Sequence, residues 1–144
     1  MVTSKQCIDI YGLPNIYMER RHMVLWDVPE HINKAIPTIP NKIYCNKDLL
    51  KPLEAAFNNI INRGYTDMVK TWDGCFNIRK KRGGTSFSLH SWGIAIDINA
   101  AWNGFKQKPQ MPNELVFCFV DAGFEWGGHW KKTPDGMHFQ LKKL

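Results

Sequence analysis

The sequence has 144 residues, of which 44% are hydrophobic and 12% aromatic. This length suits one compact domain, and the composition excludes a disordered or low-complexity chain. The formal net charge is +6, from 19 Lys and Arg against 13 Asp and Glu, an excess that favours encounters with polyanions but does not choose among nucleic acid, anionic membrane and cell wall.

The first part of the chain gives no clear periodicity. Residues 1–40 contain four prolines, which interrupt every hydrophobic pattern, and they are expected to form an irregular segment: Pro14, Pro29, Pro37 and Pro40. The first clear periodicity follows this segment and predicts an amphipathic helix, because apolar residues recur at helical spacing at Leu53, Ala56, Phe57, Ile60 and Ile61. We expect this helix to have Pro52 in its first turn and to end at Gly64.

Four further elements are predicted towards the C-terminus. Residues 74–79 are expected to form a short strand, and residues 93–99 a second one in which isoleucines alternate with smaller or polar residues. Residues 112–122 predict a helix, opened by a proline and followed by a glycine. A last strand is expected over residues 137–141, after a turn signal. Helices and strands do not alternate regularly, so the expected fold class is α+β, a small single domain with an antiparallel sheet and flanking helices.

The cysteines do not form a zinc-binding pattern of their own. The four residues are never spaced as Cys-x-x-Cys, which argues against a cysteine zinc site: Cys7, Cys45, Cys75 and Cys118. Free thiols are therefore expected.

No segment is long and apolar enough to span a bilayer, and residues 1–21 mix charges among their apolar residues. A secretory signal is therefore not expected. We expect a protein that is made in the cytoplasm and acts outside a membrane only after release.

One ten-residue stretch carries the chemistry. In Ser88-Leu-His90-Ser-Trp-Gly-Ile-Ala-Ile-Asp97, a histidine precedes a glycine turn and an aspartate lies on the strand that follows. A carboxylate flanked by isoleucines needs a cation or hydrogen bonds, because an unpaired buried charge is costly. About forty residues later, Asp135-Gly-Met-His138 places a second histidine at the start of a strand. Two imidazoles and one carboxylate form a ligand set typical of catalytic zinc, whose fourth position is open to water.

The pattern Ser-x-His-x-x-Gly-x-Ala-x-Asp, followed by Asp-x-x-His, resembles the D-alanyl-D-alanine carboxypeptidase and L-alanyl-D-glutamate endopeptidase family of zinc peptidases, and in particular its phage-endolysin branch. The resemblance extends over residues 40–144, and residues 1–144 are expected to form a single zinc peptidase domain. It implies a fold of the hedgehog and DD-peptidase type, one zinc ion, a peptidoglycan substrate and a monomer.

Residue by residue, the resemblance implies zinc ligands at His90, Asp97 and His138 and a general base at Asp135. It also implies an arginine that binds a substrate carboxylate or the developing oxyanion, with Arg79 favoured and Arg82 left open. Three more residues are expected near the substrate: Ser88, Trp126 and His129.

The predicted function is hydrolysis of peptidoglycan stem peptides during endolysin-type lysis, at the L-Ala–D-Glu bond. Within the enzyme class, D-Ala–D-Ala carboxypeptidase activity is the second hypothesis. A third is a zinc-containing wall-binding module without turnover, which Asp135 argues against. A fourth is a nucleic-acid binder, for which the chain has the charge but no recognisable reading motif.

Overall fold

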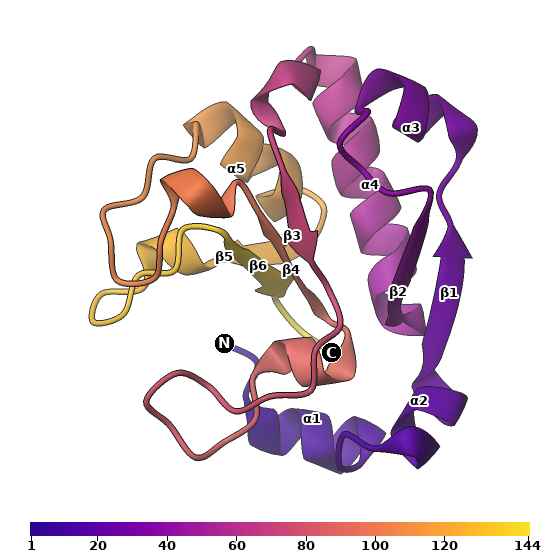
Figure 1. Ribbon diagram of the computed structural model, residues 1–144, viewed down its shortest axis with the longest axis vertical. Coiled ribbons are helices and arrows are strands. Elements are labelled where there is room, and N and C mark those ends of the chain that lie inside the picture. The colour runs from indigo at the N-terminus through magenta and orange to yellow at the C-terminus, as the bar shows by residue number, and fades with distance from the viewer.

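The computed structural model describes all residues, 1–144, and Figure 1 shows their arrangement. The N-terminal half contains α1 (Ser4–Tyr11), α2 (Ile16–His22), β1 (Met23–Asp27), α3 (Glu30–Ala35), β2 (Lys42–Asn46) and α4 (Lys47–Arg63). The C-terminal half contains β3 (Trp72–Gly74), β4 (Ala95–Ile98), α5 (Asn113–Val120), β5 (Phe124–Trp126) and β6 (His138–Leu141). Four short 3-10 helices complete it: η1 (Thr66–Met68), η2 (Leu89–Trp92), η3 (Ala100–Trp102) and η4 (Gly127–His129).

The N-terminal segment is ordered, so the expectation of an irregular segment over residues 1–40 is wrong. Thr3 caps α1 through a reciprocal capping box with Gln6, and the Asn15 side chain accepts two backbone N–H groups at the start of α2. The prolines lie between the elements or at their ends, as Pro29 does at the start of α3. They mark the boundaries of short elements whose stability comes from packing rather than from periodicity.

The helix α4 confirms the predicted amphipathic helix and its end. Gly64 takes the left-handed conformation with φ of 81° and donates its N–H to the last turn. The helix begins earlier than expected, at Lys47, because the Asn46 side chain caps it. Pro52 consequently lies inside the helix rather than in its first turn. The antiparallel pair of strands β1 and β2, which α3 connects, lies along this helix (Figure 1).

The central sheet is antiparallel, with the strand order β3-β4-β6-β5. It confirms the α+β class and the strands expected over residues 93–99 and 137–141, although β4 and β6 are shorter. The helix expected over residues 112–122 is also confirmed as α5, which packs against α4 and β5. The three-residue strand β5 has no counterpart among the predicted elements. It forms the edge of the sheet beside β6, where Trp126 pairs with Phe139.

The strand expected over residues 74–79 is wrong, because β3 ends at Gly74. The chain beyond it runs along η2 instead of along a strand. Asn77 donates its backbone N–H to the carbonyl of His90 at 3.1 Å, and the backbone N–H of Arg79 donates to Ser91 Oγ at 3.1 Å.

One hydrophobic cluster extends from Val2 to Leu141 and joins the N-terminal elements to the sheet. None of the helices combines the length and the hydropathy that crossing a bilayer requires. The four cysteines are buried and unpaired.

Candidate metal centre

The sheet register brings two of the predicted ligands together. Asp97 on β4 is paired directly with His138 on β6, and directly opposed residues of antiparallel strands project their side chains from the same face. His90 comes from η2, immediately before β4. Gly93 closes η2 with φ of 66°, and a Cβ atom there would lie 2.8 Å from the backbone nitrogen of Asn46. Only glycine fits this turn, which sets the position of His90 relative to β4.

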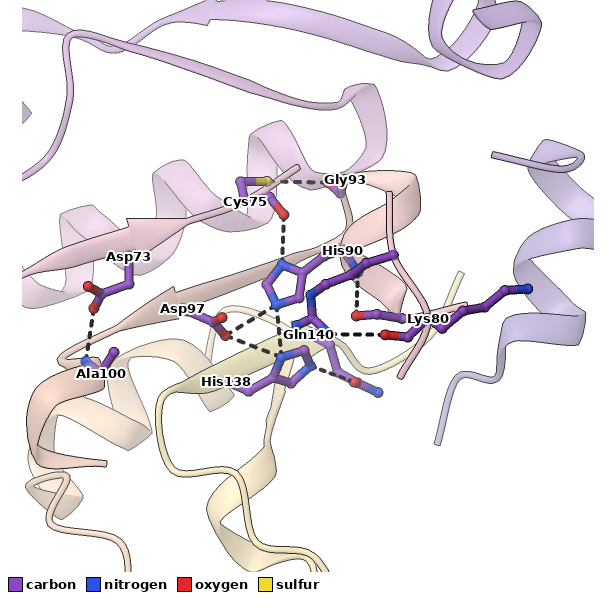
Figure 2. Close-up of polar contacts among 11 residues, drawn as sticks. Asp73, Cys75, Lys80, His90, Gly93, Asp97, Ala100, His138 and Gln140 are labelled. Carbon is purple, nitrogen blue, oxygen red and sulfur yellow. Dashed lines mark hydrogen bonds and ion pairs between the residues drawn. The ribbon is translucent and has the colours of Figure 1, made fainter. Parts of the chain in front are cut away.

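The three predicted ligands converge on one point (Figure 2). His90 Nε2 lies 3.2 Å from Asp97 Oδ1, His138 Nδ1 lies 3.3 Å from the same oxygen, and the two nitrogens are 3.2 Å apart. In a tetrahedral zinc site with bonds of about 2.0–2.1 Å, neighbouring ligand atoms are about 3.3–3.4 Å apart. The triangle of donor atoms therefore matches one face of such a tetrahedron.

The outer nitrogens of both imidazoles are held by oxygen acceptors. His90 Nδ1 lies 2.6 Å from the carbonyl oxygen of Cys75, and His138 Nε2 lies 2.9 Å from Gln140 Oε1 (Figure 2). Because these oxygens can only accept, the outer nitrogens carry the protons and the inner nitrogens of neutral rings present lone pairs. Two imidazole lone pairs and a carboxylate then face one another, an arrangement that requires a cation. The residues thus fit one divalent metal ion.

The pKa shifts of Asp97 and His138 also indicate that the site favours positive charge. Burial would raise the pKa of Asp97, but hydrogen bonds from His138 and His90, in which the inner nitrogens carry protons in the place that a metal ion would take, outweigh it and hold that pKa well below its usual value. Burial would likewise lower the pKa of His138, yet the hydrogen bond and charge of Asp97 raise it. The site therefore favours an ionised carboxylate next to positive charge.

Asp135 lies at the same cavity, in the chain just before β6. Its Oδ1 atom is buried and has no hydrogen-bond partner in the protein. Burial raises the pKa of Asp135; the charge of His138 opposes this shift and that of Asp97 adds to it. A carboxylate with a raised pKa and one buried oxygen without a partner, in a residue that lines the cavity, is suited to accept a proton from a substrate or a water molecule.

A cavity of about 500 Å³ opens at this centre. Its lining includes Asp97, Asp135 and His138 together with three of the other predicted site residues, Arg79, Arg82 and Ser88.

The two arginines at the cavity differ in the contacts that hold their side chains. Arg79 is half-buried and its guanidinium donates to the carbonyl of Lys80 at 3.3 Å, whereas Arg82 is exposed and lies over the ring of Phe105. Ser88 caps η2 and its Oγ accepts the backbone N–H of His90 at 3.4 Å, which positions the ligand.

Trp126 and His129 do not line this cavity. Trp126 is buried and its indole N–H donates to the carbonyl of Gly136 at 2.8 Å, while His129 is exposed and packs against the Trp126 ring. The backbone N–H of Asp135 donates to the carbonyl of Gly127 at 2.9 Å, and a Cβ atom at Gly127 would lie 2.6 Å from the carbonyl oxygen of Asp135. The Trp126-Gly-Gly segment therefore holds the loop that carries Asp135.

Sequence reasoning missed Gln140 and Glu125. Gln140 is buried, lines the cavity, and donates its side-chain amide to Glu125 Oε2 at 3.4 Å. The same Glu125 oxygen accepts the indole N–H of Trp130, whose ring packs against His138. The period of two along a strand could have identified Gln140, because it shares a strand face with His138.

Comparison with known proteins agrees with this geometry. Residues 82–141 match the family model described as D-alanyl-D-alanine carboxypeptidase. The matched segment is similar to that family. It contains all of the residues of the metal centre and Asp135, so the predicted resemblance is confirmed, over a shorter range than the expected residues 40–144.

Among solved structures, the chain is similar to the crystal structure of the Serratia marcescens L-Ala D-Glu endopeptidase ChiX. The two are 18% identical, and the match covers 83% of this chain and 90% of that chain with a TM-score of 0.47. A comparison with curated proteins found no match.

Proposed function

We propose that the protein is a zinc-dependent L-alanyl-D-glutamate endopeptidase that cleaves the stem peptides of bacterial peptidoglycan. The observation that carries the proposal is the convergence of three lone-pair donors beside a buried carboxylate oxygen that has no partner. Three donors of the His, Asp and His type are the usual set of a catalytic zinc site with one position left open. Together with the family of residues 82–141, this supports hydrolysis of an amide bond.

Each residue has a role that follows from its place. His90, Asp97 and His138 would hold the ion, which when bound supplies Lewis-acid chemistry to a scissile carbonyl. Asp135 would accept the proton of the attacking water at its free Oδ1 and return it to the leaving amine. Arg79, whose backbone N–H is fixed by Ser91 Oγ, would bind a carboxylate of the substrate or the developing oxyanion. Arg82 lies at the same cavity and is the second candidate for this contact.

The bond is chosen on the resemblance of the motif to the endolysin branch, in which an aspartate takes the position of the base. The description of the family model favours a second candidate, hydrolysis of the D-Ala–D-Ala bond. We propose endolysin-type lysis of the wall as the setting. Lysis of permeabilised bacteria by the added protein would support this setting. If the protein digests purified wall completely but leaves permeabilised bacteria intact, the result argues against this setting.

The test is digestion of purified peptidoglycan by the zinc-loaded protein, with and without a chelator, followed by mass analysis of the new termini. A new N-terminal D-Glu that disappears with the chelator is the expected result. Release of free D-Ala would replace the endopeptidase with the carboxypeptidase. A protein that binds zinc and wall but releases no product would overturn both in favour of a binding module.

A further inference from the structure

The rim of the cavity carries five cations on two separate loops. The first flank, Arg79, Lys81 and Arg82, belongs to the segment between β3 and η2, and the second flank, Lys131 and Lys132, belongs to the loop between η4 and Asp135. The acidic residues among the lining are Asp97 and Asp135, both at the metal centre. Away from the metal centre, the charged side chains that line the cavity are therefore all positive.

No acidic side chain of the protein forms an ion pair with these cations. The lysine and arginine ion pairs all lie elsewhere: Lys5–Asp9, Lys34–Glu30, Lys42–Asp27 and Arg63–Asp121. On the first flank, Arg82 lies with its guanidinium carbon 5.3 Å from the centre of the Phe105 ring, and the Arg79 guanidinium contacts a carbonyl. Like charges collected at the mouth of a cavity repel one another and attract anions. The site thus has more positive charge than its own acids balance.

Backbone hydrogen bonds hold the loops that carry the two flanks. The first flank lies at the base of a closed turn, in which the backbone N–H of Lys81 donates to the carbonyl of Ser86 at 2.9 Å. The loop of the second flank is tied at Pro134, whose carbonyl accepts the backbone N–H of Lys106 at 2.7 Å, and at Asp135 by its bond to Gly127. The two positive flanks are therefore anchored to different parts of the fold.

We propose that these five residues form a two-sided carboxylate clamp, which makes the enzyme select stem peptides with at least two free carboxylates over the amidated forms of the same peptides. This inference rests on the proposed function. The D-Glu residue and a diaminopimelate residue after it each carry a carboxylate that amidation removes. An ammonium or guanidinium group binds a carboxylate through charge-assisted hydrogen bonds, whereas a neutral carboxamide offers a weaker acceptor and no charge.

The test compares two synthetic stem peptides that differ only in amidation of these two carboxylates. We expect the zinc-loaded protein to hydrolyse the free-acid peptide with a kcat/KM about 3 to 30 times higher, since two partly exposed ion pairs are involved. The difference should lie mainly in KM and should shrink as salt is raised.

The double variant Lys131→Gln/Lys132→Gln should lose most of this preference, and its KM for the free-acid peptide should rise. The matched control is Lys142→Gln/Lys143→Gln, which removes the same charge from exposed positions outside the cavity and should keep both the rate and the preference. If the control loses the preference to the same extent, total charge and not the clamp is responsible.

Two outcomes separate this inference from the proposed function. Equal hydrolysis of both peptides would overturn the clamp and leave the peptidase intact. Hydrolysis of neither would overturn the proposed function, and calorimetric titration of Asp135→Asn with each peptide then decides the clamp: tighter binding of the free acid supports it, and equal binding overturns it.

Discussion

Replacement of Gln140 by leucine tests whether the hydrogen bond behind His138 sets the affinity for the metal. Gln140 Oε1 holds His138 Nε2 at 2.9 Å, and the Gln140 side chain is almost fully buried. In Gln140→Leu, the outer N–H of the imidazole loses its acceptor where no protein group replaces it. The ring is then free to adopt the other tautomer, which has its proton on the nitrogen that faces Asp97.

The expected magnitude follows from two independent considerations. Leaving a buried donor without a partner costs about 1–3 kcal/mol. Loss of an outer hydrogen-bond partner of a ligand histidine lowers metal affinity by about 10- to 100-fold, which corresponds to about 1.4–2.7 kcal/mol. The two ranges overlap. Both describe the loss of the acceptor through which Gln140 selects the metal-binding tautomer of His138.

The assay is a competition titration of zinc between the protein and a chromophoric chelator, at fixed pH. Gln110→Leu is the matched control, because the Gln110 side chain is exposed and lies outside the cavity. Urea unfolding of the metal-free proteins establishes that both variants fold. A folded Gln140→Leu protein with the zinc affinity of the unsubstituted protein would refute the reasoning.

Three further predictions concern the base and the parts of the fold that position the site. Asp135→Asn should keep zinc, by metal analysis, and lose at least about 100-fold in turnover of peptidoglycan; substantial residual activity would exclude it as the base. Asn46→Ala should lower the free energy of unfolding, measured in urea, by about 2–4 kcal/mol, because it removes the cap of α4 and leaves the buried carbonyl of Trp92 without its donor. The control Thr3→Ala, at the exposed cap of α1, should lower it by only about 1 kcal/mol. Gly127→Ala should reduce kcat while zinc affinity is kept, because the added Cβ displaces the backbone of Asp135; an unchanged kcat would show that the loop adjusts.

The metal centre was predictable because its residues are constrained locally. His90 and Asp97 lie on either side of a glycine turn that only glycine can form, and β4 and β6 are buried strands with a clear pattern. The spacing of the motif therefore carries the geometry. By contrast, the alternation over residues 74–79 resembles a strand, but its backbone partners are a 3-10 turn and a serine side chain, which sequence spacing does not reveal.

Two other differences have a similar physical origin. The N-terminal helices have eight residues or fewer, too short for periodicity to identify, and depend on caps and on contacts with the rest of the core. Trp126 and His129 are close to Asp135 in sequence, which favoured a contact with substrate. In the structure, Trp126 faces inward and supports the loop from behind, a role that depends on the tertiary packing of β5.

The burial of all four cysteines has a consequence for the environments in which the protein can work. Burial raises the pKa of Cys7 to about 12 and that of Cys45 to about 11, so these thiols stay protonated at neutral pH and react slowly with oxidants or with other thiols. A change of redox conditions should leave these thiols unaltered in the folded protein. Alkylation by a thiol reagent should accordingly follow global opening of the chain, and rapid labelling of the native protein would show that the sulfur atoms are more accessible than the structure indicates.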